Sequence, residues 1–132
     1  MSRSTILSQF APFVSMAALA TLLAPADALA GDAAAGKTAY TTNCLSCHGE
    51  TGKGDGPVGA VLPPPSPRDF SVGDFAFDTD EDGKPGSDAD LKAVIAKGAG
   101  AFGGNQMMAA WGGILSDEDI DNIVAYIRTL KQ

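Results

Sequence analysis

The stretch Cys44-Leu45-Ser46-Cys47-His48 decides the fold of this chain. On one helical turn, Cys44 and Cys47 point to neighbouring faces, so each thiol can add to one vinyl group of a porphyrin and form a thioether. His48 then lies under the iron, where its neutral imidazole can supply one axial bond. The sequence therefore predicts one haem c, bound covalently through both cysteines.

Other chemistries also use a Cys-x-x-Cys pair. A structural zinc site needs four protein ligands, and the whole chain has two cysteines and one histidine. A redox dithiol of the thioredoxin kind follows a strand in a βαβ unit, whereas the residues beside this motif are small and helix-compatible. An exported chain with two cysteines would ordinarily suggest a disulfide. The histidine directly after the second cysteine favours thioethers instead.

Residues 1–30 predict a secretory signal peptide. They contain one arginine near the start, a mostly apolar stretch over 10–24 and the ending Ala28-Leu29-Ala30, which indicates cleavage after Ala30. A membrane anchor is the alternative, but polar residues and a proline interrupt the apolar stretch, which is shorter than the ~20 residues of a transmembrane helix. We therefore expect a periplasmic protein without a stable membrane anchor, and one domain over 31–132.

The composition limits both the core and the partners. A domain of this length has a modest hydrophobic core, so a buried macrocycle would supply much of the missing apolar surface. The formal net charge of the chain is −7, and the two charges of the predicted signal peptide cancel. So acidic a surface argues against nucleic acid as a partner.

Three helices are expected, which makes the chain all-α. The first begins at Asp32 as N-cap and leads into the haem motif. The second begins near Ser87 or Asp88 and stops at Gly98. The third follows Ser116, which opens a capping box. The apolar residues at helical spacing in the second and third helices are Leu91, Val94, Ile95, Ile120, Ile123, Val124, Ile127 and Leu130.

The first and last helices are predicted to pack together. Gly36 and Tyr40 lie one turn apart on the first helix, and Tyr126 on the last helix is placed to meet both. Between these helices, residues 49–77 are rich in glycine and proline and read as a long loop. Such a loop in a small domain is usually functional, and we expect it to wrap around haem. One carbonyl among 61–64 is expected to accept a hydrogen bond from the histidine of the motif.

Taken together, these motifs resemble those of class I c-type cytochromes over nearly the whole of 31–132. The matching segments are Gly36-x-x-x-Tyr40, residues 44–49, Gly54-Asp55-Gly56-Pro57, Arg68-Asp69-Phe70, Met108-Ala109-Ala110-Trp111, and 115–120 running into 124–128. Within the class, the chain is most similar to the haem subunit of cbb3-type oxidases and to small cytochromes that serve periplasmic dehydrogenases. The resemblance implies a small cytochrome c fold, with helices and long loops wrapped around one covalently bound haem.

The second axial ligand must be a methionine if it comes from this chain. His48 is the only histidine, and Met107 and Met108 are the only methionines after residue 30, so elimination leaves both open. A thioether ligand favours ferrous iron and raises the reduction potential. In the family, the ligand is the methionine of a Met-Pro-x-Trp-like segment, which corresponds to Met108 here, with Ala109 in place of the proline. The resemblance also implies that Trp111 lies against the haem near a propionate.

An acidic segment has the opening pattern of an EF-hand calcium loop. Asp78, Asp80 and Asp82 provide carboxylates at alternating positions, and Gly83 permits the sharp turn. The twelfth position is Ala89 instead of a bidentate glutamate, although an aspartate lies on each side of it. The pattern favours a solvated acidic turn over a calcium site.

The leading interpretation is an exported electron carrier, not an enzyme, whose iron cycles between Fe(III) and Fe(II) with His/Met ligation. Its acidic surface favours redox partners with basic docking patches: a donor dehydrogenase or quinol-oxidising complex, and an acceptor oxidase or reductase. One alternative is a haem subunit of a larger dehydrogenase or oxidase. Another is a gas-binding or peroxidatic haem protein with a displaceable methionine, which lacks a second histidine to act as distal acid or base.

Overall fold

The chain is all-α, as predicted. A computed structural model describes residues 31–132, and the predicted signal peptide over 1–30 lies outside the described residues. The helices of the described part are α1 (Ala33–Asn43), α2 (Leu45–His48), α3 (Asp88–Lys97) and α4 (Asp117–Thr129), with short 3-10 helices η2 (Gly59–Val61) and η3 (Ala99–Phe102). Within 31–132 there is no β-strand.

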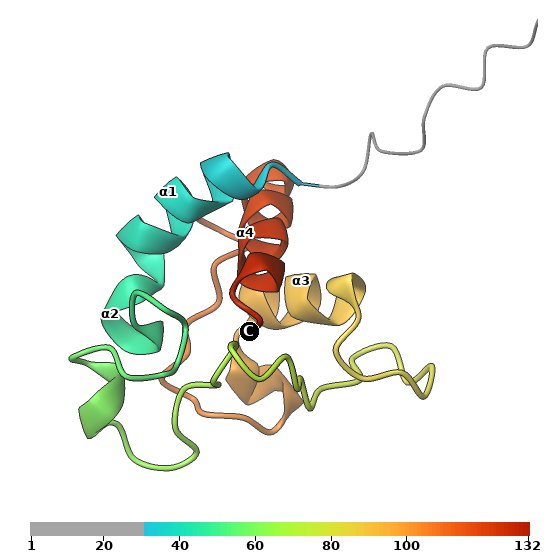
Figure 1. Cartoon of the computed structure of the whole chain (residues 1–132). Helices are drawn as coiled ribbons and strands as arrows, with labels where there is room; N and C mark the ends of the chain where they lie inside the picture. Colours follow the sequence, from blue (N-terminus) through green and yellow to red (C-terminus); the bar gives the residue numbers. More distant parts are fainter. Residues whose placement is uncertain (1–30) are drawn as a thin grey trace, which may run out of the picture.

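Helix α1 packs against α4, as Figure 1 shows at the top of the molecule. A Cβ atom at Gly36 would overlap the backbone carbonyl of Asn122, so the two helices come this close only because residue 36 has no side chain. One turn further along α1, the rings of Tyr40 and Tyr126 meet edge to face, with their centroids 5.1 Å apart. The predicted contact between the first and last helices is confirmed.

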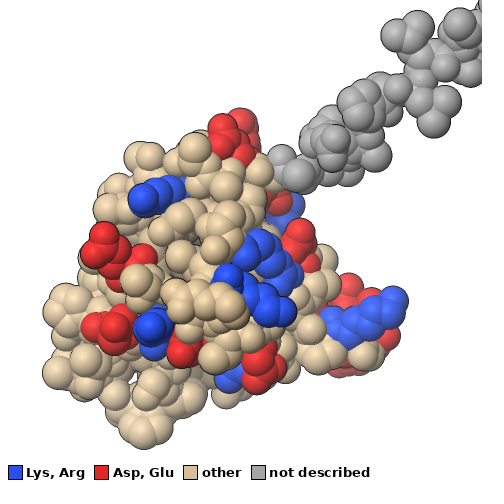
Figure 2. Space-filling model, in the orientation of Figure 1, with Lys and Arg blue, Asp and Glu red and all other residues tan. Residues whose placement is uncertain are grey.

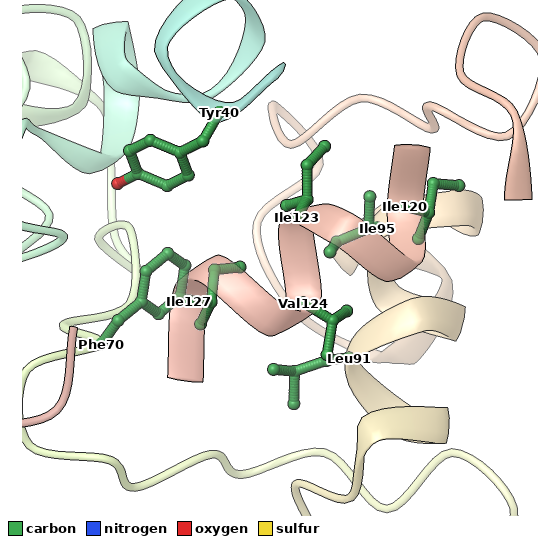
Figure 3. Packing of buried hydrophobic residues seen from close by; sticks show 8 residues of the cluster. All are labelled: Tyr40, Phe70, Leu91, Ile95, Ile120, Ile123, Val124 and Ile127. Atoms are coloured by element: carbon green, nitrogen blue, oxygen red, sulfur yellow. The ribbon is translucent and has the colours of Figure 1, made fainter. Parts of the chain in front are cut away.

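The hydrophobic core lies around α4, between α1 and α3. Figure 3 shows the side chains of α4 among those of both neighbouring helices. The buried members of this cluster are Tyr40, Phe70, Leu91, Ile95, Ile120, Ile123, Val124 and Ile127. The apolar stripe predicted for α4 is therefore buried, and Leu130 packs partly buried at its end. Phe70 comes from a loop, so it joins that loop to the helices.

Side-chain caps determine where the three longer helices begin. Asp32 accepts hydrogen bonds from two backbone N–H groups in the first turn of α1, as predicted. Ser87 and Asp90 form a capping box at the start of α3, and Ser116 and Asp119 form another at the start of α4. The predicted starts of these helices are confirmed.

Two irregular connections complete the domain. The first covers 49–87 and contains η2, and the second covers 98–116 and begins with η3. In Figure 1 they fill the lower part of the molecule, in green to yellow and in orange, and the orange connection then rises beside α4 to reach the start of that helix. Within residues 31–132, no helix has both the length and the apolar character required to cross a bilayer.

Candidate haem site

Helix α2 carries the Cys-x-x-Cys-His motif as one turn directly after α1. The backbone N–H of His48 donates to the carbonyl of Cys44 at 2.9 Å, which closes this turn. Tyr40 supports the turn from α1, because its buried hydroxyl donates to the carbonyl of Gly49 at 2.8 Å. Burial raises the pKa of Tyr40, so the hydroxyl remains a donor at neutral pH.

The long loop folds back onto the same turn through two glycines. A Cβ atom at Gly56 would overlap the carbonyl of Ser46, and one at Gly59 would overlap the carbonyl of Cys47. The backbone N–H of Val58 also donates to the carbonyl of Ser46, at 2.9 Å. The glycines that marked this region as a loop therefore allow it to contact the backbone of the motif directly.

A cavity of about 630 Å³ opens between the motif, α3 and the two connections. Cofactor and ligand sites typically have volumes of ~300–1,000 Å³ and mostly apolar walls. All five predicted site residues line this cavity: Cys44, Cys47, His48, Met108 and Trp111. The structure thus brings together two segments that lie about 60 positions apart in a chain of 132 residues.

The segment with Met108 and Trp111 is attached to the end of α3. The backbone N–H of Trp111 donates to the carbonyl of Ile95 at 3.0 Å, and that of Gly112 donates to the carbonyl of Ala96 at 3.0 Å. These carbonyls belong to the last turn of α3, where they have no acceptor role within the helix. The helix terminus therefore positions one wall of the cavity.

The ring of His48 has a buried nitrogen, Nδ1, without a hydrogen-bond partner among the described residues. Burial lowers the pKa of this histidine, and the nearby backbone of Arg68 opposes the shift only in part. The imidazole is therefore neutral at pH 7, the form that ligates metals. It stacks on Phe70 with ring centroids 4.6 Å apart. A neutral, half-buried imidazole on the wall of this cavity fits an axial ligand of haem.

The two thiols fit covalent attachment better than redox exchange. Both are free and half-buried. Burial raises the pKa of Cys44 to about 11, and the neighbouring Cys47 adds to the rise. A redox-active dithiol contains a cysteine whose pKa is lowered by its surroundings. The local electrostatics therefore do not support the thioredoxin-like alternative.

Two residues at the cavity, Asn105 and Phe70, were not predicted to have a role. The side-chain amide of Asn105 donates to the carbonyls of Pro63 at 2.7 Å and Pro65 at 2.8 Å. The expectation that a carbonyl among 61–64 pairs with the motif histidine is not met, because Nδ1 of His48 has no hydrogen-bond partner among the described residues. No local pattern signals this contact, since the partners lie 42 and 40 positions apart. Phe70 belongs to a motif that carried the resemblance, which was the available signal.

The acidic segment forms a capped turn. Carboxylate oxygens of Asp78, Asp80 and Asp82 lie within 4.8 Å of one another. The two oxygens of Asp78, however, accept hydrogen bonds from the backbone N–H groups of Asp82 at 3.1 Å and Gly83 at 2.8 Å. These bonds stabilise the turn, and Asp80 and Asp82 each accept from the backbone N–H two residues on, as in Asx turns. The turn is thus stabilised by its own hydrogen bonds, and calcium binding is not supported.

Asp90 cannot substitute for the missing glutamate of a calcium loop, because its oxygens are already used. It is 1% exposed and accepts hydrogen bonds from the backbone and hydroxyl groups of both Thr79 and Ser87. The hydrogen bonds from Thr79 and Ser87 hold its pKa well below the usual range. Asp90 thus joins the acidic turn to the start of α3.

A helical domain that presents a Cys-x-x-Cys-His turn and a methionine-bearing segment to one apolar cavity has the architecture of a c-type, haem-binding electron-transfer protein. The chain belongs to the cytochrome c family, whose family model matches residues 33–131. It fits the monohaem class I type. Membership implies covalently bound haem c, which the motif over 44–48 fits, and a role in electron transfer with redox partners.

Relatives of known type agree with this assignment. The chain is 38% identical to cytochrome c-554(547) of Halothiobacillus neapolitanus over 104 residues, which cover 77% of this chain and 100% of that protein. It is 32% identical to cytochrome c6 of Picosynechococcus sp. over 115 residues, which cover 86% and 87% of the two chains.

Solved structures of similar chains share the fold. One belongs to the Kuenenia stuttgartiensis reducing HAO-like protein complex, with a TM-score of 0.62 and 32% identity over 74% of this chain. This chain spans 41% of the length of that one. Another is cytochrome c6 from the diatom Phaeodactylum tricornutum, with a TM-score of 0.50 and 26% identity, covering 75% of this chain and 93% of that chain.

Proposed function

We propose that this chain is a periplasmic electron carrier that binds one haem c through Cys44 and Cys47, with His48 and Met108 as axial ligands. The observation that carries the proposal is that these four side chains, from two distant segments, line the same cavity. The predicted signal peptide over 1–30 supports export to the periplasm.

When bound, haem c supplies one-electron exchange between Fe(III) and Fe(II). His48 offers a neutral imidazole, whose ring orientation is restricted by stacking on Phe70. Met108 offers a soft thioether, which favours the reduced state. If His48 and Met108 both hold the iron, no position would remain for a substrate, so we infer a carrier and not an enzyme. Trp111 is proposed to pack against the macrocycle near a propionate, with its indole N–H as donor.

Two observations favour Met108 over Met107 as the ligand. Both line the cavity, but Met107 is 63% exposed. Met108 is half-buried and packs against the hydrophobic core. A ligand must keep its sulfur at a fixed position beside the iron, and a side chain held by core packing loses less conformational freedom when it does so.

Charge is unevenly distributed over the surface. Figure 2 shows an uncharged lobe at the lower left, where Figure 1 places the loop around η2. The two segments that border the cavity, 57–67 and 98–115, contain no Asp, Glu, Lys or Arg. We propose that the net charge of −7 attracts basic partners at a distance, while this uncharged rim makes the contact. Partner association should then weaken as ionic strength rises.

Optical spectra of the purified holoprotein test the proposed ligation. We expect a low-spin ferric spectrum with a weak long-wavelength sulfur-to-iron band, and a ferrous spectrum that carbon monoxide leaves unchanged. Met108→Ala should abolish the band and open the iron to carbon monoxide. The matched control is Met107→Ala, which changes the neighbouring methionine and should leave both spectra as in the native protein.

A different pattern would overturn the proposal. If Met107→Ala removes the band and Met108→Ala does not, the ligand is assigned to the wrong methionine. A high-spin ferric spectrum of the native protein, or rapid binding of carbon monoxide, would show an open iron site. The function would then be gas binding or peroxidatic catalysis instead of electron transfer.

A subunit of a larger redox complex is the second candidate function. The observation that favours it is the similar domain in the Kuenenia stuttgartiensis reducing HAO-like protein complex, which this chain covers only in part. Such a subunit would use the same iron chemistry. Size-exclusion chromatography of the chain isolated from its native cells distinguishes the two: a free carrier elutes as a small protein, whereas a subunit co-elutes with a larger assembly.

A further inference from the structure

Asn105 connects the two loops that border the cavity. Its Nδ2 donates to the carbonyls of Pro63 at 2.7 Å and Pro65 at 2.8 Å, and its Oδ1 accepts from the backbone N–H of Met107 at 2.8 Å. The backbone N–H of Met108 donates to the backbone carbonyl of Asn105 at 3.2 Å. One side chain therefore contacts the proline-rich loop and the methionine segment at the same time.

These bonds are the main polar connection between the segments 63–67 and 105–110. Among the described residues, 105–110 make no other hydrogen bond to a distant part of the chain. The segment 63–67 has four prolines, which lack an N–H, so it offers mostly carbonyl acceptors. An asparagine amide suits this position because it supplies two donors and an acceptor on one short side chain.

We propose that Asn105 is a positioning residue that holds the segment of Met108 closed over the cavity. The inference rests on the proposed function, in which the Met108 sulfur is an axial ligand. We call the hydrogen bonds of the Asn105 side chain to Pro63, Pro65 and Met107 the Asn105 clasp. Met107 directly precedes Met108, so loss of the clasp frees the backbone just before the proposed ligand. The segment then opens more often, and the sulfur spends more time away from the iron.

Two variants separate the bonds of this residue. Asn105→Ala removes all three side-chain hydrogen bonds. Asn105→Asp has nearly the same shape and keeps an acceptor for the N–H of Met107, but it cannot donate to the carbonyls of Pro63 and Pro65. Gln106→Ala is the matched control, because Gln106 is the exposed neighbour and makes no side-chain hydrogen bond in the described part of the chain.

The experiment measures how fast carbon monoxide binds to each ferrous holoprotein, together with haem content and the thermal midpoint. Asn105→Ala and Asn105→Asp should bind carbon monoxide at least about tenfold faster than the native protein, the effect of losing one or two hydrogen bonds from the closed state. Gln106→Ala should match the native protein. A merely structural role would lower the thermal midpoint without a change in ligand access at low temperature.

The outcomes distinguish this inference from the proposed function. Rapid binding of carbon monoxide to the native protein would overturn the proposed ligation itself. If the native protein binds carbon monoxide slowly and both Asn105 variants bind it as slowly as Gln106→Ala does, the clasp is refuted. It is also refuted if Asn105→Asp binds carbon monoxide slowly while Asn105→Ala binds it rapidly.

A measurement on the unchanged holoprotein covers the case in which the variants do not fold. The backbone N–H of Met107 should exchange with deuterium slowly, because it donates to Asn105 Oδ1. Exchange of this N–H as fast as that of exposed loop residues would overturn the inference.

Discussion

The α1–α4 pair and the two loops that border the cavity are held together in different ways. In the helix pair, backbone hydrogen bonds are internal to each helix, and a row of side chains on α4 is almost completely buried. The loops, 49–87 and 98–116, are connected by individual polar contacts, among them the bonds of Asn105 to the proline-rich loop and those of Thr79 to Asp90 of α3. The helix pair depends on apolar burial, whereas the loops depend on a few polar contacts and, we propose, on haem.

Because of this difference, the helix pair and the loops should respond to different substitutions and conditions. Burial is spread over many atoms, so only a steric clash at the contact should disturb the helix pair strongly. A polar contact is concentrated in one group, so a single substitution or a change of pH can remove it. The following predictions test this contrast, from the largest expected effect to the smallest.

Replacing both motif cysteines should have the largest effect. In Cys44→Ser with Cys47→Ser, no thioether can form, and a cavity of about 630 Å³ loses its proposed occupant. For a small domain, the loss is comparable with the whole free energy of unfolding, about 5–15 kcal/mol. We expect no covalent haem on a denaturing gel and no cooperative melting by circular dichroism. Ser46→Ala, an exposed change in the same turn, is the control. A double variant that melts like the native protein would show that the loops do not need haem.

Gly36→Ala should be the most damaging single change in the helix pair. The new Cβ would overlap the carbonyl of Asn122, which forces α1 and α4 apart. We expect a loss of about 3 kcal/mol in the free energy of unfolding, measured by denaturant titration. Gly113→Ala is the matched control, because a Cβ there meets no atom within 4 Å. It should change stability by less than about 0.5 kcal/mol. Equal effects of the two substitutions would contradict the close contact.

Acid should act on the loop connection through Asp90. Its pKa in the folded chain is lowered by hydrogen bonds from Thr79 and Ser87, while the unfolded chain has the ordinary value of about 3.9. The stabilisation is therefore complete above that value and is lost as the pH falls below about 4, where the unfolded chain binds the proton first. In Asp90→Asn, the free energy of unfolding should therefore decrease less steeply than in the native protein as the pH falls below about 4.

Denaturant titrations at several acid pH values check this prediction. Glu50→Gln is a suitable control, since Glu50 is exposed and accepts no hydrogen bond within residues 31–132. If Asp90→Asn and the native protein lose stability with the same slope, Asp90 is not the group that titrates.

The smallest effect is expected at the ion pair between α3 and α4. Lys92 Nζ lies 2.6 Å from a carboxylate oxygen of Asp121, and both side chains are about one-third exposed, at 39% and 33%. Solvent screens such a pair, so Lys92→Ala should lower the free energy of unfolding by no more than about 0.5 kcal/mol. Lys37→Ala, on the exposed side of α1, is the control. A loss above about 1 kcal/mol would mean that the helices depend on this polar contact as the loops do.

Much of the fold could be predicted because its signals are local. The N-cap Asp32 and the capping boxes at Ser87 and Ser116 depend on residues two to three positions away, and each occurs where the sequence indicates. The spacing of apolar residues in α4 depends only on helix geometry. The Cys-x-x-Cys-His turn is likewise complete within five residues, so this wall of the haem site could be predicted from the sequence.

The rest of the site could not be predicted, because it depends on contacts between distant segments. Asn105 meets Pro63 and Pro65 across two loops, and nothing near Asn105 in the sequence indicates such partners. Asp90 is one of the two aspartates beside Ala89 in the calcium-loop pattern, whereas the structure buries it as the acceptor for Thr79 and Ser87. Irregular loops have no repeating hydrogen-bond pattern, so their paths follow from tertiary contacts alone.

The class of cofactor chemistry, the all-α fold and the starts of the three longer helices follow from local sequence, since motif spacing, caps and periodicity act within a few residues. Only the tertiary structure decided which side chains meet around the cavity. It exposes Met107 while packing Met108 against the core, and it brings the side chain of Asn105 to the carbonyl of Pro63. The physical reason is that burial and long-range hydrogen bonding are properties of the whole packed chain, so no short segment encodes them alone.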